Sequence, residues 1–565
     1  MQCALLRGDR LHLRLEPYPL QLRSAFGTAH SSSMQRTNGL LTLEFTQESE
    51  ESEGEEGGAA ASAPPLVIRG VGEAGMPPKK TGCYELTYPA LRAHVQEWNE
   101  RMKQEAAGKD TAATSKEVSI LTEFPPPSPL YDPFSACPAP FYSALRADLA
   151  AGTVRHPLLP SLLHAFRLLD SYVASKPPAP TDAGFLCVAE AAMMDAWGKM
   201  ISRPLCEMIG VEFDGNSAEE ESTSASAAAA SAASAASSAS ASSSAPAFAS
   251  TASPASSSLF PPHRQPRSFY TVGLDSYESM QRTLSFGLEY TPLIKIKCND
   301  DVEFTQRFLE EAVRVMSTDP RSRSHMRISI DANSAWSTPA LAMRFLSILQ
   351  PHANCIAMVE QPFPLFRACP AYIDAAAAAR CDPMKVVAGE YVSLSSSELS
   401  AWGAVAAAYS ASGLLIYADE SICGVSDLRA LRSILHGVNI KLEKAGGYRG
   451  ALRLMHAARE SGVAVWLGCM VGSTPNATQA AHLLPIATPD CWGDLDGNLL
   501  TNPDSDRFRG GMKWIRDGKG SIGMTSPQEL GLADSAVGTM AGTGVIEKSQ
   551  TNSNGSQDTQ KQQQK

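Results

Sequence analysis

The sequence lacks the features that define several large classes of protein. It has no apolar run approaching the ~20 residues that span a bilayer, and none of its 12 cysteines forms a C-x-x-C pair. Acidic residues outnumber basic ones by 59 to 48, so the formal net charge is −11. A general nucleic-acid binder needs a basic face, which this balance disfavours. We therefore expect neither membrane nor nucleic acid as a partner, and reduced thiols as in the cytoplasm.

The N-terminal residues also lack a secretory signal. The first twenty, MQCALLRGDRLHLRLEPYPL, contain no long apolar segment, and Leu11, Leu13 and Leu15 alternate as in a β-strand. We therefore expect a cytoplasmic protein. A short organellar import segment stays compatible with this pattern.

Several stretches have compositions that do not build a packed core. They are the acidic residues 47–64, the polar and Pro-rich residues 104–135, the Ser/Ala-rich residues 216–266 and the Gln/Ser/Asn-rich tail 540–565. Residues 366–398 form a further candidate, with an Ala-rich stretch and a possible strand KVVAGE at 385–390. Because long surface loops cost little free energy, we interpret the internal stretches as insertions.

A chain of 565 residues is long enough for more than one domain, and two structural patterns remain outside the insertions. The N-terminal part has strand-like segments at 11–15, 39–45 and 66–72, and helical spacing at 86–102, 138–150, 160–175 and 184–209. Eight apolar strands then alternate with helical stretches; they lie in 268–275, 291–297, 327–333, 355–362, 414–420, 437–444, 463–470 and before 494–497. This alternation predicts parallel βα units, and eight units favour a closed barrel.

Carboxylates end three consecutive strands of the predicted barrel. Asp331 follows RISI, Glu360 follows CIAMV, and Asp419 follows LLIYA. Any one of them could be a helix N-cap. Three together, at the rim where catalytic groups of a barrel project, favour a Mg²⁺ site with positions open to water and substrate. Asn333 and Glu420 are candidates for supporting hydrogen bonds.

Lysines lie on two further strands. Lys295 and Lys297 are two residues apart and share one strand face, and Lys441 lies on another strand. Alternating lysines also occur on solvated edge strands, but the βα context favours the barrel interior. We interpret Lys444 as structural. A neighbouring cation favours the neutral, proton-accepting form of a lysine, and a divalent metal stabilises the enediolate formed when an α-proton leaves. Two lysines on opposite faces of a substrate could then epimerise it.

The motifs resemble those of the mandelate racemase/muconate lactonizing subgroup of the enolase superfamily. They are FGTAH (26–30), KIK (295–297), DAN..W (331–336), EQPFP (360–364), ADES (418–421), NIKLEKAGG (439–447), GCM (468–470) and DLDG (494–497). The last three together are similar to those of dipeptide epimerases such as the L-Ala-D/L-Glu epimerases. The resemblance implies an α/β fold: a modified (β/α)7β TIM-like barrel with an α+β capping domain built from the N-terminal part and the C-terminal segment.

The resemblance also implies roles for individual residues. The acid/base catalysts would be Lys297 and Lys441. One Mg²⁺ per subunit would be bound by Asp331, Glu360 and Asp419. The dipeptide would be contacted by Lys295, which also tunes Lys297, by Cys469 and Met470, and by Asp494 and Asp496, which would hold its ammonium group. DLDG is also typical of a simple turn. A homo-oligomer is the implied assembly.

The domain prediction has five parts. Residues 1–215 form the capping domain, 216–266 a disordered insert, 267–495 the barrel, 496–535 the return to the capping domain, and 536–565 a disordered tail. The sequence departs from the family in its capping loop, HSSSMQRTNG. Relatives that prefer Ala-Glu often carry an Arg there, and Arg36 is displaced by a residue or two.

Two alternatives to a dipeptide epimerase stay open. A muconate-type cycloisomerase or o-succinylbenzoate synthase-like enzyme would use the same barrel without needing the paired acids Asp494 and Asp496. A catalytically silent barrel would serve as a scaffold whose insertions recruit partners.

Overall fold

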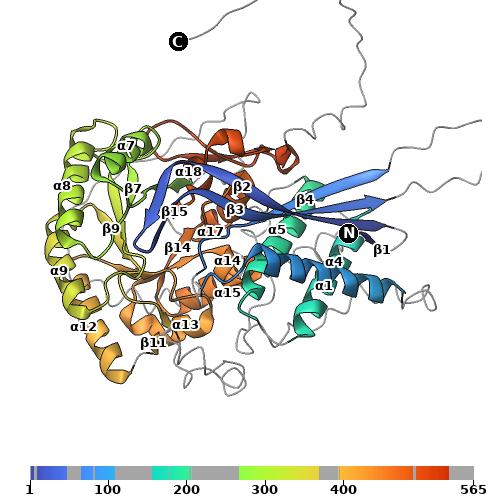
Figure 1. Cartoon of the computed structure of the whole chain (residues 1–565), viewed down its shortest axis with the longest axis horizontal. Helices are drawn as coiled ribbons and strands as arrows, with labels where there is room; N and C mark the ends of the chain where they lie inside the picture. Colours follow the sequence, from blue (N-terminus) through green and yellow to red (C-terminus); the bar gives the residue numbers. More distant parts are fainter. Residues whose placement is uncertain are drawn as a thin grey trace, which may run out of the picture.

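The structure is a computed structural model that describes residues 2–4, 9–47, 65–79, 83–107, 156–176, 179–202, 205, 266–367, 392–393, 395–487 and 492–532. The helix expected at 138–150, the strand KVVAGE and the tail 536–565 lie outside these residues, as do most of the insertions expected at 47–64, 104–135 and 216–266. The described chain forms a four-stranded sheet with helices at one end and a barrel at the other, joined by a long hairpin (Figure 1).

The N-terminal sheet, here called the cap sheet, is antiparallel. Its strands are β1 (Gln2–Ala4), β2 (Arg10–Thr28), β3 (Ser31–Gln47) and β4 (Leu66–Ala74), in the order β1-β2-β3-β4. Alternate residues such as Leu11, Leu13, Leu41 and Leu43 are buried, as expected for a sheet with one face on the core. The three strand-like segments expected at 11–15, 39–45 and 66–72 are confirmed, and they pair in order as an antiparallel meander.

Three helices belong to the same hydrophobic core as the cap sheet. They are α1 (Tyr88–Ala107), α4 (Leu159–Ala174) and α5 (Asp182–Ile201). The helix expected at 184–209 therefore ends earlier than predicted. Its last turn is closed by Ser202 in the left-handed conformation, at φ 56°. Gly72 of β4 allows α5 to approach closely, since a Cβ there would lie 2.1 Å from the carbonyl oxygen of Val188.

The second sheet is a closed parallel barrel. Its strands are β5 (Arg267–Ser268), β6 (Tyr270–Val272), β7 (Leu293–Lys297), β8 (Arg327–Asp331), β9 (Ile356–Glu360), β12 (Ile416–Ala418), β13 (Gly437–Ile440), β14 (Ala464–Gly468) and β15 (Trp492–Asp494). The sheet order is β5-β15-β14-β13-β12-β9-β8-β7-β6. Phe269 alone separates β5 from β6, and its N–H donates to the carbonyl of Gly493 at 2.9 Å. The first and last strands of the sheet are thus one interrupted strand, and eight strands close the barrel.

Helices follow seven of the barrel strands and surround the sheet (Figure 1). The main ones are α7 (Tyr277–Leu288), α8 (Val302–Thr318), α9 (Pro339–Leu349), α12 (Ser396–Ala411), α13 (Val425–Leu431), α15 (Gly447–Glu460) and α16 (Thr474–Ala481), with short α14 (Leu442–Ala445) and α17 (Leu484–Ala487) beside them. After β15 the described chain forms only the four-residue α18 (Gly497–Leu500) before it turns away. The predicted (β/α)7β fold is confirmed.

One edge of a predicted insertion was wrong. Helix α12 begins at Ser396, inside the span 366–398 that we interpret from sequence as an insertion. A capping box defines this start: Ser395 accepts from the N–H of Glu398, and the Glu398 carboxylate accepts from the N–H of Ser395 at 2.8 Å. The S-x-x-E pattern was visible in the sequence and marks the helix start. Within the same span, the described pair β10 (Phe366–Arg367) and β11 (Val392–Ser393) is parallel.

The segment after the barrel returns to the cap sheet. Strands β16 (Phe508–Arg509) and β19 (Gly531–Leu532) pair, as do β17 (Met512–Trp514) and β18 (Ile522–Met524). The ring of Phe508 packs edge-on against Tyr18 of β2, with centroids 5.9 Å apart. The return is as the sequence suggests, while the boundaries between the predicted domains stay predictions.

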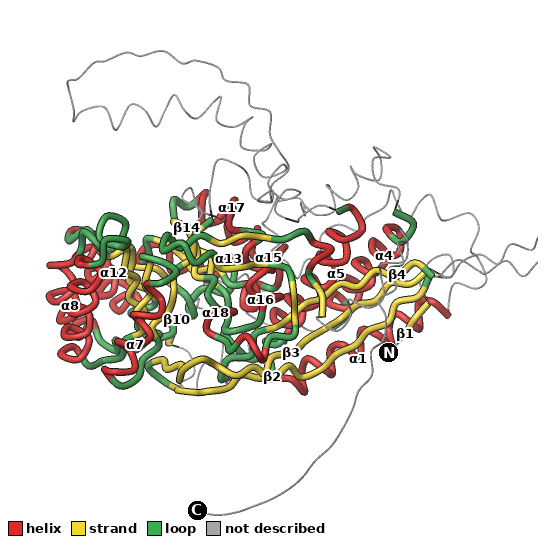
Figure 2. Tube along the Cα trace, turned by 90° about the horizontal axis from the view of Figure 1, so that it is seen from above, coloured by secondary structure: helices red, strands yellow, loops and turns green. Residues whose placement is uncertain are grey.

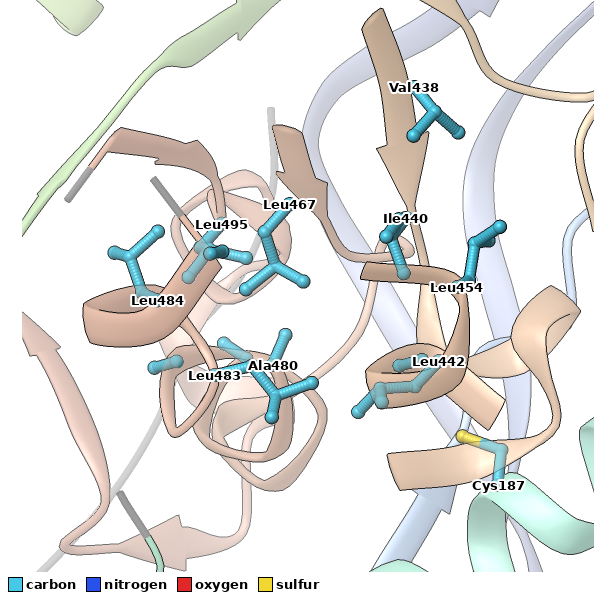
Figure 3. Packing of buried hydrophobic residues seen from close by; sticks show 14 of the residues in the cluster. Cys187, Val438, Ile440, Leu442, Leu454, Leu467, Ala480, Leu483, Leu484 and Leu495 are labelled. Atoms are coloured by element: carbon cyan, nitrogen blue, oxygen red, sulfur yellow. The ribbon is translucent and has the colours of Figure 1, made fainter. Parts of the chain in front are cut away.

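The cap and the barrel share one hydrophobic core. Figure 3 shows Cys187 of α5 near Leu442, which follows the barrel residue Ile440, and all three belong to one hydrophobic cluster. The β2–β3 hairpin spans both parts, and Figure 2 shows it running along the molecule to the barrel. Its tip lies against the end of β6, where the N–H of Leu274 donates to the carbonyl of Gly27 at 2.9 Å. No helix in the described part of the chain is both long and apolar enough to cross a bilayer.

We predict that Gly72→Ala destabilises the protein, because its Cβ must displace the backbone of α5. The expected loss in free energy of unfolding is about 1–3 kcal/mol, the usual range for overpacking. Gly403 within α12 is the control, since its Cβ would meet nothing closer than Ile434 at 3.7 Å. Gly403→Ala should stabilise by about 0.5–1 kcal/mol. Urea unfolding followed by circular dichroism measures both, and equal stability of Gly72→Ala and the wild type would contradict the packing argument.

Candidate active site

Charged side chains at the C-terminal ends of the barrel strands surround a cavity of about 400 Å³. The barrel contributes Lys295, Lys297, Asp419, Lys441, Asp494 and Asp496 to its lining. Cys469 and Met470 line it too, and the cap closes it with His30, Arg36, Lys79 and Tyr84. A cavity of this size suits a small molecule. Eight of the ten site residues expected from sequence line it, while Asp331 and Glu360 are fully buried beside Lys295.

The strand order places the key residues in opposed pairs. Lys297 ends β7 and Lys441 follows β13, so three strands separate the two lysines in either direction around the barrel. Glu360 ends β9 and Asp494 ends β15, which are opposed in the same way. Side chains at the C-terminal ends of barrel strands converge on one mouth. Lys297 and Lys441 therefore face each other across the cavity, whereas Lys295 lies between Glu360 and Asp494.

Lys295 is the hub of the charge network. Its Nζ lies 3.0 Å from Asp331 Oδ2, 2.8 Å from Glu360 Oε2 and 2.7 Å from Asp494 Oδ2. The side chain is 1% exposed. Burial alone would lower its pKa, but the surrounding carboxylates raise the pKa well above its usual value. One ammonium thus connects acids from three strands.

Asp419 has a separate pair of cations. Lys441 Nζ lies 2.8 Å from its Oδ2 and Lys444 Nζ lies 2.7 Å from its Oδ1. Despite burial, these lysines hold the pKa of Asp419 well below its usual value. Lys444 also donates to the backbone carbonyls of Asp419 and Ile422, so it fixes the loop after β12.

Burial and a neighbouring acid act in opposite directions on Lys441. Here burial disfavours the charge, but Asp419 outweighs it and raises the pKa of Lys441.

The carboxylate oxygens of the site suit a hard cation, although lysine side chains pair with these acids in the structure. Among the described residues no three His, Cys, Asp or Glu side chains lie ready to hold a metal. The cluster nevertheless holds more carboxylates than ammonium groups: Asp331, Glu360, Asp419, Asp494 and Asp496 against Lys295, Lys297, Lys441 and Lys444. Burial and the charge of Asp331 raise the pKa of Glu360 to about 7. Excess negative charge on oxygen donors suits Mg²⁺.

Left-handed backbone positions the loops behind these acids. Asn333 has φ 44° and Gln361 has φ 38°, conformations that cost free energy for residues other than glycine. The N–H of Asn333 donates to Asp331 Oδ1 at 2.9 Å, and its Nδ2 donates to Glu420 at 3.2 Å. Gln361 Oε1 accepts from the N–H of Asp419 at 2.9 Å. Asn333 and Glu420 thus have the supporting contacts that the sequence suggested, and Gln361 was missed although it stands in the EQPFP motif.

Asp494 and Asp496 lie together at the C-terminal end of β15, and Lys295 lies between Asp494 and Glu360. The N–H of Thr271 donates to Asp496 Oδ2 at 2.6 Å, and its hydroxyl donates to Asp494 Oδ1 at 3.4 Å. Burial and the neighbouring Asp494 raise the pKa of Asp496 to about 7. Two adjacent buried acids with few cations suit a cationic ligand group. Sequence reasoning missed Thr271, which is one polar residue within an apolar strand.

The cap adds cations and a phenol to the cavity. Arg36 of β3 is 9% exposed, and its Nη1 donates to the carbonyl of Gln35 at 3.2 Å. Burial lowers the pKa of Arg36. The hydroxyl of Tyr84 donates to Asp419 Oδ1 at 3.3 Å. Arg36 carried a sequence signal through its place near the FGTAH loop, whereas nothing in the sequence singled out Tyr84.

Comparisons with known proteins agree with the fold. Residues 394–520 match a family model described as "Enolase C-terminal domain-like". The chain is 29% identical over 504 residues to an enolase superfamily member of Dictyostelium discoideum, covering 88% of this chain and 90% of that one. It is 26% identical over 247 residues to an L-Ala-D/L-Glu epimerase of Bacteroides thetaiotaomicron, covering 44% of this chain and 51% of that one.

Solved structures show the same fold. A dipeptide epimerase from Enterococcus faecalis, complexed with Mg and L-Leu-L-Tyr, matches with a TM-score of 0.53 at 16% identity, over 94% of this chain and 99% of that one. A muconate lactonizing enzyme from Pseudomonas fluorescens matches with a TM-score of 0.52 at 15% identity, over 93% and 96%. At these identities the likeness concerns the fold alone. The structural neighbours include both dipeptide epimerases and muconate lactonizing enzymes, so the fold does not identify the reaction.

We predict that Lys295→Met strongly destabilises the protein without divalent cations, because Asp331, Glu360 and Asp494 would stay buried without their shared ammonium. The expected loss is about 3–5 kcal/mol, as for other broken buried ion pairs. Urea unfolding in the presence of a chelator measures it. The exposed Arg321, paired with Asp319, gives the control, since Arg321→Met should change stability by about 1 kcal/mol or less. Equal effects of the two substitutions would show that Lys295 does not hold the cluster.

Proposed function

The chain belongs to the enolase superfamily, and we propose that it is a Mg²⁺-dependent epimerase of dipeptides. In this proposal Lys297 and Lys441 are the acid/base pair, and Asp331, Glu360 and Asp419 bind one Mg²⁺. The observation that carries the proposal is the opposed placement of the two lysines across one cavity. A lone base would exchange a proton on one face, whereas an opposed pair can invert the carbon between them.

The two acidic groups fix which way a substrate lies. The three carboxylates at the C-terminal ends of β8, β9 and β12 suit Mg²⁺, which when bound would supply positive charge to stabilise an enediolate. Asp494 and Asp496, on the opposite side, would hold the ammonium group of the dipeptide, with Cys469 and Met470 beside it. The carbon whose proton moves then lies between Lys297 and Lys441. One lysine removes the proton from its face, and the ammonium of the other returns a proton to the opposite face.

Lys295 would keep the two acidic groups at a fixed separation. It connects Glu360 to Asp494, and its side chain is almost fully buried at the cavity wall. Its fixed positive charge beside Lys297 would disfavour a second cation and so favour the neutral, proton-accepting amine. We also propose Lys295 as a contact of the substrate, because it lines the cavity.

The alternatives account for less of the site. A cycloisomerase or o-succinylbenzoate synthase-like enzyme has no need for two adjacent buried acids supported by Thr271. A silent scaffold would not need a buried cluster whose ionised groups cost free energy to assemble. A dipeptide substrate would use both the paired acids Asp494 and Asp496 and the buried charge cluster. We propose a cytoplasmic location and keep the homo-oligomer as a prediction from the family resemblance.

The central prediction concerns α-proton exchange in D₂O, followed by NMR with a panel of dipeptides and Mg²⁺. The wild type should epimerise at least one dipeptide and lose this activity in a chelator. Lys297→Ala and Lys441→Ala should each slow epimerisation by about 10²–10⁴-fold, the usual contribution of general acid–base catalysis. Each variant should still exchange the proton of one epimer, and the two variants should differ in which one.

Lys199 supplies the matched control, because it pairs with Asp195 on α5, outside the cavity lining. Lys199→Ala should keep wild-type exchange. Epimerisation surviving the loss of either cavity lysine would remove the two-base mechanism. Absence of exchange with every dipeptide would remove the proposed function.

We further predict that Arg36 favours dipeptides with an acidic side chain, since its buried guanidinium lines the cavity. Arg36→Met should raise KM for an acidic dipeptide about 10-fold or more, as for a lost charged hydrogen bond. KM for an uncharged dipeptide should change little. Arg14→Met on the exposed face of β2 is the control. Equal effects on acidic and neutral dipeptides would contradict this role.

A further inference from the structure

A buried carboxylate outside the cavity joins the cap sheet to the barrel. Glu73 of β4 is fully buried. Its Oε1 accepts from Asn38 Nδ2 at 2.6 Å, and the N–H of Ser473 donates to both of its oxygens at 3.1 and 3.2 Å. The hydroxyl of Ser473 donates to Oε2. Asn38 belongs to β3 and Ser473 to the loop after β14, so one carboxylate connects three segments of the chain.

The backbone of Glu73 is held as well. Its N–H donates to Gln479 Oε1 at 2.7 Å, and its carbonyl accepts from Gln479 Nε2 at 3.0 Å. Asn38 extends the network, because its Nδ2 also donates to the carbonyl of Val471 at 3.1 Å and its Oδ1 accepts from the N–H of Met76 at 3.0 Å. The end of β4 and the loop 469–473 are therefore fixed to each other by directional bonds.

The segments that Glu73 joins lead into the cavity. On the barrel side, Cys469, Met470 and Val471 line it; on the cap side, residues 77–79 and Arg36 do. The contact between the two sides is close, because a Cβ on Gly75 would lie 2.2 Å from Met470 Cβ. A small shift of the loop against β4 would thus change the cavity wall.

The same network reaches the segment that follows Lys441. Glu443 accepts from Asn476 Nδ2 at 2.7 Å and from the N–H of Gly75 at 3.3 Å. Asn476 Nδ2 is also 3.4 Å from the carbonyl of Glu73. The cap strand is therefore tied both to the loop that lines the cavity and to the short helix α14 that begins beside Lys441.

A purely structural role explains this carboxylate poorly. Burial raises the pKa of Glu73 to about 7 although Asn38 and Ser473 donate to it. An apolar side chain of similar size would avoid the free energy needed to bury an ionised group. Ser473 also stands at the N-cap of α16, yet its hydroxyl makes no capping bond to the helix and is directed at Glu73.

We propose that Glu73 is a positioning residue that sets substrate affinity by fixing the loop 469–473 against the cap strand β4. The proposal rests on the proposed function for its substrate. It assigns no chemical step to Glu73, which lies outside the cavity lining. Removing it should therefore weaken dipeptide binding and leave the rate of proton transfer nearly unchanged.

Two variants of Glu73 test the proposal, with steady-state kinetics on the best dipeptide and with Mg²⁺. Glu73→Ala should raise KM about 10-fold or more while kcat stays within about 3-fold, the pattern of lost uniform binding. Glu73→Gln keeps an acceptor oxygen and a donor for the Ser473 hydroxyl, so it should restore most of the affinity. Glu44→Ala is the control, since Glu44 lies on the same sheet and bonds the exposed Arg69.

Amide hydrogen exchange gives a readout that needs no activity. Glu73→Ala should speed exchange at Ser473, whose N–H loses its acceptor, and Glu44→Ala should not. Should Glu73→Ala fail to fold, Ser473→Ala removes one bond of the network and should raise KM about 3-fold. A wild type inert toward all dipeptides would sink the proposed function, whereas unchanged KM or unchanged exchange at Ser473 in Glu73→Ala would overturn the positioning role alone.

Discussion

The structure of the barrel mouth depends on one ammonium group. Lys295 is buried and connects Asp331, Glu360 and Asp494, carboxylates from three strands. Buried acids of like charge repel one another strongly, so without a central cation the ends of β8, β9 and β15 would not remain together in a dry interior. The same repulsion among the buried carboxylates would favour the binding of a second cation at the barrel mouth. The carboxylates outnumber the lysines, and burial together with a neighbouring acid raises the pKa values of Glu360 and Asp496 to about 7.

The closed barrel determines how these charged side chains are arranged in space. Each parallel strand carries one or two functional side chains at its C-terminal end, and eight strands distribute them around a ring. Because Lys297 and Lys441 are four strand positions apart, they oppose each other without any special loop. The loops supply fine placement instead. Asn333 and Gln361 adopt positive φ angles that only a strongly constrained environment would retain, and both hold a carboxylate-bearing segment through hydrogen bonds.

Residues with a local signal could be predicted from the sequence, and residues that act across the fold could not. Asp331, Glu360 and Lys297 each end an apolar run, so periodicity alone places them at the barrel rim. The start of α12 also has a local signal, the capping box of Ser395 and Glu398. Tyr84 and Glu73 have no such local signal in the sequence. Each acts on a residue more than 300 positions away, Asp419 and Ser473, and no pattern near either residue records that partner.

The way the cap is attached follows from what the cavity requires. The apolar core shared by cap and barrel supplies most of the attachment free energy, but apolar contact is non-directional and permits small sliding motions. A cavity wall made by two segments must be fixed more closely than that. Buried hydrogen bonds have narrow angular tolerance, and leaving one unmade is costly, so they select a single register. The bonds around Glu73 and Asn38 lie where β4 and the loop 469–473 meet, beside residues that line the cavity. Apolar burial therefore holds the cap and the barrel together, and the buried hydrogen bonds fix their relative position.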